Sequence, residues 1–142
     1  RLISWEQDET LEQSKVKANT YLRLADCYIW QNVSLDKAIE YLTLLQNQPH
    51  VNQQELLQVL VHAYLKKGNV VAAKDILKLL QPRETSLEYA YLQGMLFYRD
   101  GMLDQAKSIW KPFLKSTVNS IRQHWMKEKI LNCYFQDSPQ KN

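Results

Sequence analysis

The sequence has few of the residues that turn a chain sharply or cross-link it. Only three glycines, four prolines and two cysteines occur among its 142 residues. A β-rich protein, or an enzyme built on glycine loops, needs more turn glycine than this, so the composition favours an almost wholly helical chain. No stretch approaches about 18 uninterrupted apolar residues, and we therefore expect no transmembrane helix.

The motifs of catalysis and metal binding are also missing. The sequence has no phosphate-binding loop, no glycine-rich dinucleotide turn and no HExxH motif. The three histidines, His50, His62 and His124, have no metal-ligand spacing, and neither cysteine has a base beside it. We therefore predict a protein that is not an enzyme, with no catalytic residue, no metal site, no cofactor and no small-molecule substrate.

Charge is distributed unevenly along the chain. Residues 1–60 carry a net charge of −3, and residues 61–142 carry a net charge of +6. A basic half can attract an acidic partner or a phosphate backbone, but scattered lysines more often form a solvated helix surface. One cluster mixes basic and aromatic side chains as nucleic-acid-binding surfaces do: Arg122, His124, Trp125, Lys127 and Lys129. Because Trp125 fits more simply on the apolar face of a helix, we do not expect nucleic acid as the partner.

The chain does contain an internal repeat. An aromatic residue, a glycine and an alanine recur at a spacing of 33 residues, first as Tyr64, Gly68 and Ala73 and then as Phe97, Gly101 and Ala106. A looser copy lies upstream around Ala25, Tyr28 and Ala38. A fixed period of about 20–50 residues indicates one supersecondary unit copied along the chain. The ends of a stacked array lie far apart, so we predict that Cys27 and Cys133 are unpaired, buried thiols, which favours a reducing compartment such as the cytoplasm.

Start and stop signals divide the sequence into seven predicted helices. Capping-box patterns open three of them, at Thr10-Leu11-Glu12-Gln13, Asn52-Gln53-Gln54-Glu55 and Thr85-Ser86-Leu87-Glu88. The other predicted N-caps are Ser34, Asn69 and either Asn119 or Ser120.

Glycine and proline give the predicted helix ends. Gly68 and Gly101 are expected to end helices in the left-handed conformation, and the helix from Val70 is expected to reach Leu80. Pro112 lies inside the sixth helical pattern. Because proline lacks an N–H donor and clashes with the preceding turn, we predict a kink or an early end there.

The pattern resembles the tetratricopeptide repeat (TPR) family. In that family a small residue and an aromatic lie three apart in the first helix of a pair, followed by Gly or Asn, a small residue and a bulky apolar residue. One copy matches in full: Gly94, Phe97, Gly101, Ala106 and Trp110. A second copy has Val in place of the small residue: Val61, Tyr64, Gly68, Ala73 and Leu77. A third copy has one inserted residue: Ala25, Tyr28, Asn32 and Ala38.

This resemblance implies an all-α fold of about seven helices, arranged as a right-handed superhelical array of antiparallel helix pairs (a TPR-like α-solenoid). It implies a single domain over residues 1–142, with repeats at about 18–50, 54–86 and 87–118. Residues 120–135 would form a closing helix that covers the last apolar face, and residues 137–142 a disordered tail.

In this family the first helices of successive pairs line a concave groove. Carried over to this sequence, the resemblance places ten residues there: Asn19, Arg23, Asp26, Gln58, His62, Lys66, Tyr91, Met95, Tyr98 and Arg99. Aromatic side chains, Met and Arg are the types that most often anchor a bound peptide. The aromatic members could instead pack against neighbouring helices, which is the commoner role of aromatics at helical spacing.

The resemblance therefore implies a non-catalytic protein-interaction module that holds a peptide or helix of another protein. Such a module acts as an adaptor, chaperone or assembly factor, as the chaperones of bacterial type III secretion do. The alternative is a regulatory or sensor domain cut from a longer chain, such as a transcription regulator or a component of an envelope or secretion complex. The absence of an initiating methionine favours this alternative. A homodimer formed through the last helical face also stays open.

Overall fold

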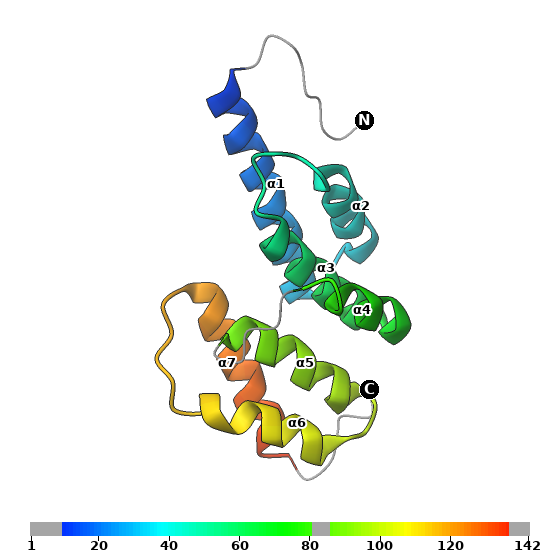
Figure 1. Ribbon diagram of the computed structural model, residues 1–142, viewed down its shortest axis with the longest axis vertical. Coiled ribbons are helices and arrows are strands. Elements are labelled where there is room, and N and C mark those ends of the chain that lie inside the picture. The colour runs from blue at the N-terminus through cyan, green and yellow to red at the C-terminus, as the bar shows by residue number, and fades with distance from the viewer. Residues whose placement is uncertain (1–9, 81–85, 137–142) are drawn as a thin grey trace. The chain divides into compact units, whose positions relative to one another are not determined.

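The computed structural model describes residues 10–80 and 86–136 (Figure 1). Within these ranges the chain is helical and no strand occurs, so the predicted all-α class is confirmed. The elements in chain order are α1 (Leu11–Gln31), α2 (Leu35–Leu45), α3 (Gln53–Lys67), α4 (Val70–Leu77), α5 (Leu87–Arg99), α6 (Leu103–Trp110), the 3-10 turn η1 (Lys111–Phe113) and α7 (Ile121–Tyr134). The predicted disordered tail at 137–142 lies outside the described residues.

The chain divides into two compact units, residues 1–80 and 81–142. The first unit holds α1 to α4, and the second holds α5 to α7 with η1. The boundary lies between α4 and α5, near the end of the second predicted repeat. One continuous superhelical array over residues 1–142 stays a prediction.

In the first unit, α1 and α2 form an antiparallel hairpin, and α3 contacts both of these helices before pairing with α4 (Figure 1). Aromatic rings join α1 to α2: Tyr41 meets Tyr21 edge to face at 5.0 Å between ring centroids and stacks with Tyr28 at 6.4 Å. Fully buried aliphatic side chains such as Leu22, Leu42 and Leu56 fill the space between the three helices. Removing this apolar area from water is the main term that holds the unit together.

In the second unit, α5 and α6 form the hairpin, and α7 contacts both (Figure 1). The indole of Trp110 is fully buried and donates from Nε1 to the carbonyl oxygen of Ala90, at 3.2 Å. It lies directly over Gly94, where a Cβ would occupy the space of the indole ring. The glycine of the repeat pattern is therefore required for the close approach of α5 and α6.

The predicted closing helix at 120–135 is present as α7, and side-chain hydrogen bonds hold it to α5. Gln123 Nε2 donates to Glu88 Oε2 at 3.0 Å, and the Tyr98 hydroxyl donates to Gln136 Oε1 at 2.6 Å. Its apolar side, with Met126, is buried.

Several predicted helix ends are confirmed. Thr10 forms a complete capping box with Gln13, and Asn69 accepts from Ala72 N at 3.1 Å. Ser120, not Asn119, caps α7 by accepting from Gln123 N at 3.1 Å. These bonds satisfy N–H groups that the first turn of a helix leaves without a partner.

The predicted left-handed stops are confirmed as well. Gly68 has φ 84° at the end of α3, and Gly101 has φ 79° just after α5. The corresponding Asn32 ends α1 with φ 58°, since asparagine tolerates this region better than most residues. Pro112 also acts as predicted, because α6 stops at Trp110 and the chain continues as a 3-10 turn.

Four local predictions were wrong. Ser34 precedes α2 but has φ 51° and no capping bond, so its hydroxyl is not in reach of the helix N–H groups. The cap of α5 is Ser86, which accepts from Tyr89 N at 3.2 Å, and so lies one residue after the predicted Thr85. The helix from Val70 ends at Leu77, three residues before the predicted end.

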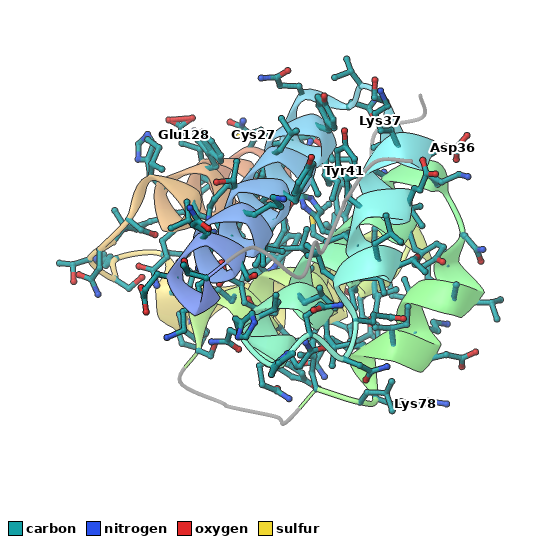
Figure 2. The ribbon with its side chains drawn as sticks, turned by 90° about the horizontal axis from the view of Figure 1, so that it is seen from above. Cys27, Asp36, Lys37, Tyr41, Lys78 and Glu128 are labelled. Carbon is teal, nitrogen blue, oxygen red and sulfur yellow. The ribbon has the colours of Figure 1, made fainter. Side chains whose placement is uncertain are left out.

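The fourth error concerns the thiols. Both cysteines are free, as predicted, and Cys133 is buried. Cys27, labelled in Figure 2, is exposed. It lies on α1 between the buried Asp26 and the half-buried Tyr28, where the helix turns to solvent. An apolar run does not fix which of its members faces out.

Candidate protein-interaction site

One surface of the first unit joins the first helices of two successive pairs, and we call it the α1–α3 face. Its residues follow each other at spacings of three or four, so they lie on one side of each helix. The members on α1 are Asn19, Arg23, Asp26 and Trp30, and those on α3 are Glu55, Gln58, His62 and Lys66.

Two side-chain contacts join the helices along this face. An Arg23 guanidinium nitrogen lies 2.5 Å from Glu55 Oε2, and the side chains are 52% and 24% exposed, respectively. Further along, the rings of Trp30 and His62 meet edge to face with centroids 4.6 Å apart. The two contacts follow the same direction on both helices, so the residues between them are held side by side.

Exposure changes along the face. At the start, Asn19 and Arg23 are exposed, and Gln58 is half-buried. Toward the C-terminal ends of the helices, Asp26 and His62 are buried, at 4% and 3% exposure. A bound segment would therefore contact the side chains of Asn19 and Arg23. The buried Asp26 and His62 are not accessible to it and instead contribute to the packing of α1 against α3.

The predicted site residues on α5 are placed differently. Tyr91, Met95 and Tyr98 are buried, at 0%, 6% and 5% exposure, and only Arg99 is exposed. Because Tyr98 already donates to Gln136 and lies 6.1 Å from the Trp110 ring, its side chain is engaged within the second unit. Of the ten predicted residues, the structure brings together the six on α1 and α3.

One member of the face, Trp30, was absent from the predicted positions. It lies four residues after Asp26, so helical spacing would have found it. The ion pair between Arg23 and Glu55 joins two helices and cannot be read from the pattern of one helix alone.

The mixed basic and aromatic cluster of the sequence does not form one surface. Lys127 contacts the Ser116 carbonyl on the α6 side of α7, whereas Lys129 is two residues on and so points about 200° away around the helix. His124 Nε2 lies 2.9 Å from Glu128 Oε2.

Among residues 10–80 and 86–136, no three or more His, Cys, Asp or Glu side chains are grouped so that they could hold a metal ion. In the same ranges, the helices are too short or too polar to span a membrane.

Comparisons with known proteins give no relative: no protein-family model, no curated protein and no solved structure matches this chain.

Proposed function

We propose that the protein is a non-catalytic interaction module of the TPR type that holds a peptide or helix of another protein on its α1–α3 face. The observation that carries the proposal is the placement of Arg23, Glu55 and Gln58 at an accessible seam between the first helices of two pairs. First helices that lie side by side are the basis of the groove in that family. In support, α3 contacts both helices of the preceding pair, as successive repeats of a solenoid do.

The chemistry of the face suits an adaptor or assembly factor. Exposed amide and guanidinium groups bind backbone carbonyls and carboxylates of an extended or helical segment. Arginine at the centre of an interface is among the residues that lose most binding energy on truncation. The Arg23–Glu55 pair holds the guanidinium in place before a partner arrives, which lowers the entropy cost of binding.

The test is a binding comparison between two double variants. Peptides selected from a displayed random library against the wild-type chain are measured against Arg23→Ala with Gln58→Ala, and against Lys37→Ala with Lys78→Ala. The second pair of residues is exposed, on α2 and just after α4, and serves as the matched control (Figure 2). We expect the first variant to weaken binding by roughly tenfold or more, and the control to bind as the wild type does.

Either of two results would contradict the proposal. Selected peptides that bind both variants equally would place the recognition surface elsewhere. Failure to select any peptide with a wild-type chain that circular dichroism shows to be folded would contradict the proposed peptide-binding role.

A further inference from the structure

A second surface, on the second unit, is defined by charge. Between Asp104 and Glu128 the chain carries five basic residues and no acidic one. This stretch includes most of α6, the 3-10 turn and the first half of α7. Four of the five basic residues are lysines on α6, on α7 or in the connection between these helices.

Two contacts fix the direction of α6 against α7. Near one end, Lys107 Nζ lies 5.4 Å from the centroid of the Tyr134 ring. At the other end, Lys127 Nζ donates to the carbonyl oxygen of Ser116. The helices therefore run antiparallel, with the start of α6 beside the end of α7.

Two more lysines lie in the chain between the two contacts. Lys111 follows Lys107 by four residues, where α6 gives way to η1, and Lys115 lies in the turn after η1, next to Ser116. Both are exposed. We call Lys107, Lys111, Lys115 and Lys127 the lysine seam.

We propose that the lysine seam docks an acidic segment of a partner protein, as a second surface distinct from the α1–α3 face. Lys107 and Lys111 are separated by one helical turn, which rises about 6 Å, and this matches carboxylates placed at every fourth position of a helical partner. Two acidic side chains near α7 already have partners: Glu128 lies against His124, and Glu88 of α5 accepts from Gln123, one helical turn before Lys127. The lysine seam thus offers a partner two exposed cations, Lys111 and Lys115, flanked by the half-buried Lys107 and Lys127.

An aromatic pair closes one end of the seam. Tyr134 and Phe135 meet edge to face at 5.1 Å, and Phe135 is 73% exposed. An exposed aromatic beside a row of cations suits a segment that carries an apolar residue next to its acidic ones. The observations favour protein over nucleic acid, since Phe113 and Trp125, which neighbour the lysines in sequence, are half-buried and so offer little ring surface for stacking bases. The seam also lacks arginine, the residue most used for planar phosphate recognition.

The probe is a short fluorescein-labelled, alanine-rich helical peptide with glutamate at every fourth position and one terminal tryptophan. Its binding is measured by fluorescence anisotropy to the full chain, to Lys111→Glu with Lys115→Glu, and to Lys74→Glu with Lys78→Glu. The last two lysines are exposed, four residues apart, and lie at α4 in the first unit, so both variants change the net charge equally. We expect the seam variant to weaken binding about tenfold or more, the α4 variant to have little effect, and added salt to weaken wild-type binding.

Three results would overturn the inference. The first is equal weakening by both variants, which would indicate unspecific charge attraction. The second is tighter binding of a single-stranded oligonucleotide of the same charge, lost in the seam variant, which would make the partner nucleic acid. The third is absence of peptide binding while sedimentation shows wild-type self-association that the seam variant abolishes, which would make the occupant a second copy of this chain. The Arg23→Ala, Gln58→Ala variant should bind the acidic peptide normally, so the two proposals fail separately.

Discussion

The indole of Trp110 and the missing side chain of Gly94 occupy complementary positions on facing helices. The corresponding positions 33 residues earlier hold Val61 and Leu77, which are also buried. The first unit has more bulk on its first helix and less on its second, and the second unit has the reverse. Close packing tolerates such an exchange only when both members change, because interiors have almost no free volume.

We therefore predict strong coupling between these positions. Gly94→Val and Trp110→Leu should each destabilise the protein by about 3 kcal/mol, the first by overpacking and the second by leaving a cavity. The double variant should lose at least about 1 kcal/mol less than the two single losses combined. Urea denaturation followed by circular dichroism measures all four corners of this cycle. Losses that simply add would show that the two side chains do not share one space.

At the scale of helices, the capping hydrogen bond distinguishes a serine that stabilises a helix start from one that only precedes a helix. Ser120 and Ser34 both precede helices, but only Ser120 makes the capping bond, whereas Ser34 has left-handed φ. Ser120→Ala is expected to cost about 1 kcal/mol of unfolding free energy, because a helix N–H loses its acceptor. Ser34→Gly should be neutral or stabilising, since glycine adopts positive φ without strain. Thermal unfolding of the two variants tests this, and a larger loss for Ser34→Gly than for Ser120→Ala would contradict it.

The helices were largely predictable because their boundaries are encoded locally. Thr10 and Gln13, Gly68 and Pro112 each act within one or two turns of their own position. Ser34 was mispredicted because its backbone is left-handed, as is that of Asn32 two residues earlier, and its side chain makes no capping bond. Helical spacing identified the face of α1 and α3, but not that Tyr98 would be engaged by Gln136, 38 residues further on. Contacts between residues so far apart in sequence depend on how the helices pack together, and the residue pattern of one helix does not contain that information.

At the scale of the whole molecule, the division into two compact units predicts that the first unit folds on its own. Residues 1–80 contain two helix pairs with a shared core of buried side chains. Expressed alone, this segment is expected to keep its helical signal and to unfold cooperatively, with a stability of about 3–5 kcal/mol as for other small cores. Urea titration by circular dichroism and by near-ultraviolet absorption tests this. A gradual transition, or transitions that differ between the two probes, would show that the first unit depends on the second.

The close approach of Trp110 to Gly94 also determines the order in which these two residues can be substituted during evolution. A descendant that first replaces Trp110 by leucine carries a void, which neighbouring side chains partly fill. A descendant that first gains a side chain at Gly94 must displace the buried ring and break its bond to Ala90. Substitution from the Gly94–Trp110 pairing to a pairing like Val61–Leu77 is therefore expected to begin at Trp110. A side chain at position 94 is tolerated only after Trp110 has been replaced by a smaller residue.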